Sequence, residues 1–427
     1  MTFLNVAEIE SALVALNGSY PALTMLLPLP NVTHDLRHSN ALLIRGDPSF
    51  DCRPALVFVS GVHAREWGGP DILVNLATDL LEAYTKSAGL GYGGKTFSAA
   101  DVKTIVNRTD IVVFPDINPD GRAYSMSGAP HSNQAMWRKN RNPASGGGST
   151  GNAGVDVNRN YDFLWNFPVT FSPNAVPPAS TDPGAETFFG TAPFSEPEAQ
   201  NVRWLVDQFP NARYFVDVHS FSGDVLYPWG DDENQTTDPS KSFKNSAWDG
   251  QRGVAGDAYG DYLPAARLVE LQTAANVMRD GIYAVRSQSY VTKQGFWLYP
   301  TSGTSEDWAF TREFLDPTKA KLSGFVIEFN KNIDFFPTWA EMKDLIVDVD
   351  AGLVALCVHA RPGFIQVILC WFRHWWPFRD RFWAIWHRVF PPELWGPYGP
   401  WTRIVRTAER VADRIVAVIR GIGRRGR

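Results

Sequence analysis

Four short apolar runs, separated by segments with helical periodicity, most constrain how this chain can fold. The runs are Ala55–Ser60, Ile111–Pro115, Tyr214–Val218 and Gly324–Phe329. Uninterrupted apolar strands are typical of sheets covered on both faces, because neither face meets water. The helices expected between and after these strands begin at Pro70 and cover Leu268–Val285 and Trp339–Val358. The pattern predicts an α/β fold, with a mixed, mostly parallel sheet covered by helices on both faces.

Turn and cap signals indicate where further elements begin or end. Asn118–Gly121 is a strong turn signal. Ser195 and Glu198 have the spacing of a capping box, which makes Ser195 the predicted N-cap of a helix ending near Phe209. Residues 163–194 are rich in Pro, Ser, Thr and aromatic side chains, and are expected to form a long surface loop.

Charge divides the 427 residues into two regions. The net charge is −5, but residues 361–427 hold 13 Arg, no Lys and four acidic residues, a net charge of +9, which leaves −14 for residues 1–360. Such an asymmetry indicates regions with different roles. We therefore predict a main domain over residues 1–360 and an Arg- and Trp-rich extension over residues 361–427.

Cysteine usage and hydropathy disfavour several classes of protein. The three cysteines have no spacing typical of a metal or redox pair, and their odd number implies no disulfide framework. The first residues lack a basic segment followed by an apolar one, so no signal peptide is visible. The sequence contains no run of about 18 or more apolar residues, so no membrane span is predicted. The sequence by itself therefore favours a cytoplasmic protein.

Polar side chains at the ends of two apolar runs point to a metal site. His63 and Glu66 follow the first run, and His219 follows the third. The carboxyl ends of such strands are where α/β folds place chemistry, and His and Glu are ordinary zinc ligands. Taken singly, a His-x-x-Glu pair is more often a surface pair. A lone histidine at a strand end is more often one whose ring nitrogens are hydrogen-bonded within the protein. Glu328, inside the fourth run, is either a salt-bridged carboxylate or a general base with a raised pKa.

Further motifs, in a fixed order, make the chain resemble the zinc carboxypeptidases of the A/B type. The motifs are Val62–Trp67, Asn118–Gly121, Trp137–Lys139, Val155–Asn160, His219–Ser222, Leu226–Gly230, Tyr299–Trp308 and Phe325–Glu328. The resemblance covers about residues 5–358, and so many motifs in one order are far harder to obtain by chance than any one alone. The resemblance implies a catalytic domain over residues 1–360 that removes C-terminal residues from peptides with the help of zinc.

The resemblance also implies roles around the metal. One Zn²⁺ would be bound by His63, Glu66 and His219, with its fourth position left to water. Asp156 would hold the first histidine in its tautomer. Glu328 would take a proton from the attacking water and pass it to the leaving amine. Arg138 would stabilise the developing oxyanion.

The substrate-binding residues follow from the same resemblance. The terminal carboxylate of the substrate would be held by Asn158, Arg159 and Tyr299, since a guanidinium fork matches a planar carboxylate. Arg65 would lie along the approach for the rest of the peptide. Glu306 would form the floor of the side-chain pocket. An acid there favours C-terminal Lys or Arg, unless an arginine of the protein neutralises it.

Alternatives to this function stay open. They are an apolar or mixed preference, action on cell-wall peptides, and a non-catalytic peptide-binding protein on the same fold, which the complete set of ligands, base and arginines disfavours. Residues 142–194 and 309–323 look longer than in the digestive members, and Phe221 stands where many members have Tyr. No inhibitory prosegment is recognisable, so activity is expected without proteolytic release.

The expected partners are peptide or protein C-termini, with no nucleic acid, and the chain is expected to be a monomer. Residues 361–427 have the composition of a segment that lies on an anionic membrane surface or binds an acidic partner. Docking on the main domain and an unselected extension are the other interpretations. Although members of the resembled family are often secreted, the sequence itself shows no signal for export.

Overall fold

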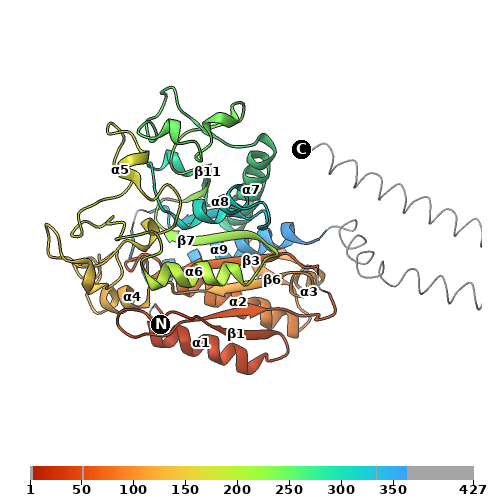
Figure 1. The fold of residues 1–427 in the computed structure, drawn as a ribbon. Coiled ribbons are helices and arrows are strands. Elements are labelled where there is room, and N and C mark those ends of the chain that lie inside the picture. The colour runs from red at the N-terminus through yellow and green to blue at the C-terminus, as the bar shows by residue number, and fades with distance from the viewer. Residues whose placement is uncertain (1–2, 51, 333, 363–427) are drawn as a thin grey trace, which may run out of the picture. The chain divides into compact units, whose positions relative to one another are not determined.

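The computed structural model describes residues 3–50, 52–332 and 334–362 (Figure 1). Residues Met1–Pro362 form one compact unit. The interpretation of residues 361–427 falls outside the described residues, apart from Arg361 and Pro362, so the division at residue 360 stays a prediction. Within the described ranges, no helix is both long enough and apolar enough to span a membrane.

Eight strands form the central sheet. In spatial order they are β1 (Thr24–Pro28), β2 (Asn40–Ile44), β6 (Asp110–Phe114), β3 (Ala55–Ser60), β7 (Ala212–Ser220), β12 (Ser323–Phe329), β8 (Asp224–Tyr227) and β11 (Val291–Gln294). The four central strands β6, β3, β7 and β12 run parallel, as do β8 and β11. The pairs β1–β2, β2–β6 and β12–β8 are antiparallel. The prediction of a mixed, mostly parallel sheet is confirmed, because the apolar runs are its buried centre.

Helices cover the two faces of this sheet. The α-helices of the described residues are α1 (Val6–Ser19), α2 (Gly68–Thr85), α3 (Ala99–Arg108), α4 (Pro119–Met126), α5 (Phe167–Thr170), α6 (Pro197–Asp207), α7 (Ala265–Arg286), α8 (Ser305–Leu315) and α9 (Trp339–Ala360), of which the four-residue α5 lies in the loop over residues 163–194 rather than on the sheet. In strand β12, Gly324 lies against α8. The next residue, Phe325, contacts Tyr214, and that ring contacts His359 of α9. Since successive strand residues point to opposite faces, α8 and α9 cover opposite faces, and Figure 1 shows α6 crossing in front of the sheet.

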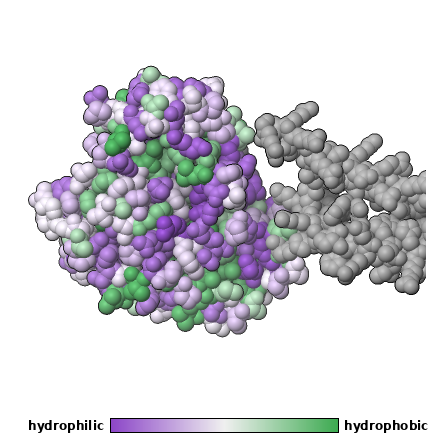
Figure 2. Space-filling model, in the orientation of Figure 1, coloured by the Kyte–Doolittle hydropathy of each residue, from purple (hydrophilic) through white to green (hydrophobic). Residues whose placement is uncertain are grey.

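Shorter elements lie in the connections. They are the pairs β4 (Leu90–Tyr92) with β5 (Lys95–Phe97) and β9 (Asn234–Gln235) with β10 (Asp261–Tyr262), and the 3-10 helices η1 (Pro143–Ser145), η2 (Val157–Arg159), η3 (Pro239–Lys241), η4 (Ser246–Trp248) and η5 (Gly295–Trp297). On the face seen in Figure 2, hydrophilic and hydrophobic residues are mixed. Single exposed apolar side chains of this kind are normal for a folded protein.

The predicted capping box at Ser195 is wrong. Helix α6 begins at Pro197 after Glu196, and its N-cap makes no side-chain bond. The Ser195 hydroxyl donates instead to Glu196 Oε1, at 2.7 Å. Glu198 accepts from the Asn140 amide, at 3.0 Å, so a partner far along the chain has replaced the local cap. This long-range contact is the reason the local pattern misled.

The turn predicted at Asn118–Gly121 is the first turn of a helix. Asn118 is the N-cap of α4, and its Oδ1 accepts from the Gly121 amide at 2.9 Å. Pro119 stands at the first helical position, where its fixed φ and missing N–H cost nothing. The same residues that signal a turn therefore start a helix here.

Candidate metal centre and active site

Two neighbouring strands deliver the three predicted metal ligands to one edge of the sheet. Strands β3 and β7 are parallel and paired up to Ser60 and Val218, so His63 and His219 emerge at the same end. Glu66 lies between the two rings. His63 Nδ1 is 2.7 Å from Glu66 Oε1, and His219 Nδ1 is 3.1 Å from Glu66 Oε2. All three side chains are buried.

These three residues fit a zinc ion. Their ligand atoms all lie within 4.8 Å of one another. The two imidazole Nδ1 atoms face each other at 3.2 Å, which leaves room for only one proton between them and suits a shared cation. Two imidazoles and one carboxylate are an ordinary donor set of a catalytic zinc, which keeps a further position open. The structure thus brings the predicted ligands together.

A glycine lets the chain turn toward this site. Gly61 follows β3 with a φ of +73°, a conformation that other residues rarely adopt. A Cβ at this position would also lie 2.9 Å from the Asp116 carboxylate. The turn at Gly61 then directs His63 to the strand edge.

Each histidine has a buried carboxylate behind it. His63 Nε2 is 3.3 Å from Asp156 Oδ1, and His219 Nε2 is 3.2 Å from Asp217 Oδ2. Carboxylates in this position fix the tautomer and the ring orientation of a metal-bound histidine. Burial by itself would raise the pKa of Asp156, yet Arg138 and His63 hold that pKa well below its ordinary value. Asp156 is therefore ionised, as its predicted orienting role requires.

Asp217 escaped the sequence analysis, although a signal was available. It precedes His219 by two residues in β7, and residues two apart share one face of a strand. An acid on the ligand's side of a buried strand needs a partner. Asp217 has two, because it also accepts from the Ser305 hydroxyl at 2.8 Å. It thus joins a metal ligand to the start of α8.

Glu328 lies beside the same centre. In the parallel pair β7–β12 it is the register partner of His219. Its side chain is only partly exposed, and this desolvation raises its pKa to about 8, with Glu66 adding to the rise and His219 and Arg138 opposing it. A carboxylate with a raised pKa next to a metal site has the property that a general base needs at neutral pH.

Arg138 is held by hydrogen bonds to Asp156 and to the segment that carries the metal ligands His63 and Glu66. Its Nε donates to Asp156 Oδ2 at 2.9 Å, and its carbonyl accepts from the Ala64 amide at 3.0 Å. The Asn118 amide bridges the same two segments by donating to Val62 O and Lys139 O, each at 3.1 Å. The motifs Val62–Trp67, Asn118–Gly121 and Trp137–Lys139 are therefore bonded to one another.

The predicted carboxylate-binding residues lie on η2 and on the loop after η5. Asn158 Oδ1 accepts from the Ser305 amide at 2.8 Å, which leaves its NH2 group for other partners. Arg159 is buried and donates to the carbonyls of Pro178 and Asn158, each at 2.7 Å. Its guanidinium carbon lies 5.8 Å from the ring centre of Tyr299, a side chain that is 42% exposed. Arg159 therefore lies next to both Asn158 and Tyr299.

Glu306 is buried at the first turn of α8. Gly324 of β12 allows this, because a Cβ there would lie 2.1 Å from the Glu306 carbonyl oxygen. Burial raises the pKa of Glu306, and nearby Asp217 raises it further. In the described part of the chain its Oε2 has no hydrogen-bond partner, and no Lys or Arg forms an ion pair with it.

The family comparison agrees with this constellation. A family model described as zinc carboxypeptidase matches residues 9–344, a span that includes every site residue above. The chain belongs to the zinc carboxypeptidase family. Membership implies zinc as the metal that His63, Glu66 and His219 would hold.

Several relatives of this chain carry related names. Carboxypeptidase B of Astacus astacus is 26% identical over 304 residues, 71% of this chain and 80% of that protein. Metallocarboxypeptidase A of Trichophyton tonsurans is 32% identical over 202 residues, 46% of this chain and 41% of that protein. An inactive metallocarboxypeptidase of Ajellomyces capsulatus is 32% identical over 196 residues, 44% of this chain and 28% of that protein. The chain thus spans less than half of these two fungal relatives.

A solved structure shows the same fold. The crystal structure of thrombin activatable fibrinolysis inhibitor superposes with a TM-score of 0.62 at 19% identity, covering 84% of this chain and 74% of that one. The predicted carboxypeptidase-like α/β fold is confirmed.

Arg65, which is predicted to lie along the approach for the peptide, is held by a charged and an aromatic neighbour. Its Nη1 pairs with Glu186 of the loop over residues 163–194, at 3.0 Å. Its guanidinium also lies over the ring of Phe335, 4.5 Å from the centre, and Phe335 contacts Phe221 at 4.6 Å. Phe221, which stands where many members of the family have Tyr, therefore packs against the Phe335 ring that contacts the Arg65 guanidinium. A cavity of about 470 Å³ is lined by Glu186, the partner of Arg65, and by Arg138 among others.

Proposed function

We propose that this chain is a zinc-dependent carboxypeptidase that removes C-terminal residues from peptides and prefers Lys or Arg. The observation that carries the proposal is the convergence of His63, Glu66 and His219 with Glu328 at one sheet edge. Family membership supports the same activity. Peptide and protein C-termini are then the partners of the site.

The chain's own residues have complementary tasks in this reaction. Bound zinc would supply a Lewis acid that polarises the scissile carbonyl and acidifies water. Glu328 removes a proton from the attacking water, whose oxygen joins the carbonyl carbon, and returns that proton to the amine as the C–N bond breaks. Arg138 donates to the oxyanion that develops on the carbonyl oxygen. Asn158, Arg159 and Tyr299 hold the terminal carboxylate, so that only the last peptide bond reaches Glu328.

The preference for a basic residue rests on Glu306. A buried carboxylate without a cationic partner is costly, and Glu306 has an unpartnered oxygen within the described residues. A Lys or Arg side chain of the substrate would supply the missing charge. An arginine of the protein, the alternative raised by the sequence, is not paired with Glu306 in the described part of the chain.

Release of the last residue from matched peptides tests the proposal. We expect peptides ending in Arg or Lys to be cleaved with a kcat/KM about 100-fold above the same peptide ending in Phe, since the site's buried acid stays unpaired with Phe. A peptide ending in an amide should resist cleavage, because it lacks the carboxylate. A clear preference for Phe would contradict the proposed specificity. Slow but measurable release of the C-terminal residue would still support the carboxypeptidase activity.

A non-catalytic peptide-binding protein is the second candidate, and the inactive metallocarboxypeptidase among the relatives favours considering it. Zinc quantification alongside the release assay separates the two. Stoichiometric zinc with no release of any C-terminal residue, amid retained peptide binding, would favour the binding protein.

A further inference from the structure

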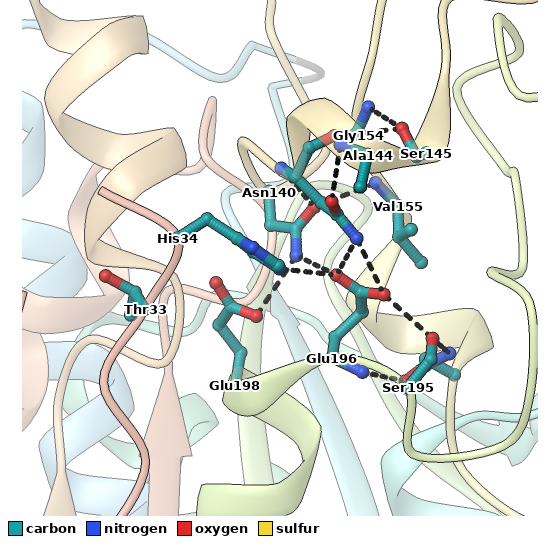
Figure 3. A network of polar contacts seen from close by, with 12 residues as sticks. Thr33, His34, Asn140, Ala144, Ser145, Gly154, Val155, Ser195, Glu196 and Glu198 are labelled. Carbon is teal, nitrogen blue, oxygen red and sulfur yellow. Dashed lines mark hydrogen bonds and ion pairs between the residues drawn. The ribbon is translucent and has the colours of Figure 1, made fainter. Parts of the chain in front are cut away.

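A second cluster of titratable side chains lies at the start of α6 (Figure 3). Its members are His34 from the loop between β1 and β2, Asn140, and the carboxylates Glu196 and Glu198. Asn140, Glu196 and Glu198 are buried, with at most 1% exposure. None of the four has been assigned a role in the reaction.

Glu196 is the centre of this cluster. Four side chains donate to or share a proton with its carboxylate, namely His34 at 3.1 Å, Asn140 at 2.7 Å, Asn142 at 3.0 Å and Ser195 at 2.7 Å. Its backbone amide donates to Asn160 Oδ1 at 3.0 Å. Burial raises the pKa of Glu196, but these donors more than offset it and lower that pKa below its ordinary value. Glu196 is therefore an ionised carboxylate with all its acceptor sites in use.

Asn140 links Glu196 to the segments that carry active-site residues. Its Oδ1 accepts from the Val155 backbone amide at 2.8 Å, and its backbone amide donates to the Val155 carbonyl at 2.9 Å. Asn140 thereby fastens the segment carrying Arg138 to the segment that continues into Asp156. Asn160, held by the amide of Glu196, ends the same segment after Asn158 and Arg159. The oxyanion residue and the carboxylate-binding residues thus stand on segments tied to Glu196.

Donors rather than a metal neutralise the cluster. His34, Glu196 and Glu198 have the donor types of a metal site. The Asn140 NH2 group, however, donates to both carboxylates, at 2.7 Å and 3.0 Å. The backbone amides of Val155 and Asn142 hold the Asn140 oxygen on the other side, so the NH2 cannot turn away. An NH2 group fixed between two carboxylates occupies the place where a cation would bind them.

We propose that Glu196, acting through Asn140 and Asn160, is a positioning residue for Arg138 and for the carboxylate-binding pair Asn158 and Arg159. The inference rests on the proposed carboxypeptidase function. Misplacing reacting groups by about 1 Å can cost about 100-fold in rate. A hub on the far side of these segments therefore controls both substrate binding and transition-state stabilisation.

Glu198 provides a matched control on the same helix. It shares Asn140 with Glu196, but Asn140 is its only side-chain donor, and its Oε1 has no hydrogen-bond partner within the described residues. Burial raises the pKa of Glu198 to about 7, so it is readily neutral. A glutamine at 198 can accept from Asn140 with its oxygen. A glutamine at 196 offers one acceptor oxygen to four donors, and its NH2 group would face the NH2 of Asn140.

Kinetics of the zinc-loaded variants E196Q and E198Q on a peptide ending in Arg test the proposal. We expect E196Q to raise KM and lower kcat, together about 30-fold in kcat/KM, and E198Q to stay within about twofold of wild type. Both should bind one zinc per chain. A variant that merely folded less well would lose kcat in proportion to its folded fraction and keep its KM.

Calorimetric binding of free arginine examines the same positioning without catalysis. We expect the affinity to fall about tenfold in E196Q and to remain in E198Q, since free arginine presents the same carboxylate. Equal kinetics and equal arginine affinity in E196Q and wild type would overturn the inference. A second zinc bound by wild type and lost in E198Q would overturn it as well, since the cluster would then be a metal site. A wild type that binds arginine but releases no residue would defeat the proposed function alone.

Discussion

Two sets of buried carboxylates in this molecule differ in their neighbours. Glu66 and Asp156, at the metal centre, face histidines or Arg138, and their pKa values are lowered although burial acts in the opposite direction. Burial raises the pKa values of Glu306 and Glu328, and the opposing effects of neighbours such as His219 are too weak to offset it. The neighbours, rather than burial, decide the ionisation of each acid. The first set is ready to hold a cation, and the second set is free to act on the substrate.

This division separates tasks within one site. Acids whose charge is matched inside the protein build a rigid centre, because removing either partner leaves a buried charge uncompensated. Acids whose charge is unmatched gain from a proton or from a cationic substrate. Each prediction below changes one member of the second set, or a residue at the metal centre that the first set helps to build.

Removing a metal ligand should have the largest effect. With His219→Ala, we expect zinc binding to be lost and peptide release to fall at least about 10⁴-fold, since the Lewis acid and its activated water go together. Metal analysis and a release assay measure this. His359→Gln, a histidine of α9, should retain both zinc and activity. Full zinc occupancy in His219→Ala would break the assignment of the paired set.

Glu328→Gln should come next. We expect kcat to fall about 10³-fold, within the range for loss of a general base, while zinc stays at one per chain. Stopped assays with an Arg-terminated peptide, together with metal analysis, give both quantities. The surface variant Glu341→Gln serves as control. Undiminished release by Glu328→Gln would refute the assigned base.

Glu306→Leu should alter selectivity more than rate. We expect the ratio of kcat/KM for Arg over Phe peptides to fall about 100-fold, because the pocket loses the charge that pairs with a cation. In wild type, KM for the Arg peptide should decrease as pH rises through the raised pKa of Glu306, since deprotonation creates that charge. KM for the Phe peptide should lack this dependence. An Arg preference that survives in Glu306→Leu would place the specificity elsewhere.

Folding stability gives a second measure of Glu306. Its pKa is raised in the folded state, so folding binds a proton there, and stability falls as pH rises from the unfolded to the folded pKa. Thermal unfolding of Glu306→Gln should show a smaller decrease between pH 5 and pH 8 than wild type. Identical pH profiles would mean that the pKa of Glu306 is not raised in the folded chain.

Asp217→Asn should have the smallest effect of the series. We expect zinc affinity to weaken about tenfold, the lower end for loss of a carboxylate behind a metal-bound histidine. Competition with a chelator measures this. Asp224→Asn is a matched control on another strand of the same sheet, because Asp224 pairs with Lys293 at 2.9 Å rather than with a histidine. Equal zinc affinity in the two variants would show that Asp217 does not orient His219.

Much of the fold and part of the site could be predicted from the sequence. The strands β3, β6, β7 and β12 were predicted because their side chains are apolar without interruption, and the long helices because their apolar residues recur at helical spacing. His63, Glu66 and His219 were predicted as ligands from residue type, position at strand ends and resemblance, and the structure brings them together. The signals for strands and helices are contained in a few consecutive residues, whereas the resemblance rests on the order of short motifs along the chain.

The tertiary structure decided what depends on distant partners. Ser195 and Glu198 carry a local pattern typical of a helix cap, yet Asn140, more than fifty residues away, donates to the carboxylates of Glu196 and Glu198. Arg65 is predicted to lie along the approach for the substrate, and only the structure shows that Glu186 from a long loop pairs with it. A hydrogen bond or an ion pair has similar strength whether its partner is near or far along the chain. Local sequence therefore determined the elements and the chemical types of the site, and only the folded packing selected which charges are paired.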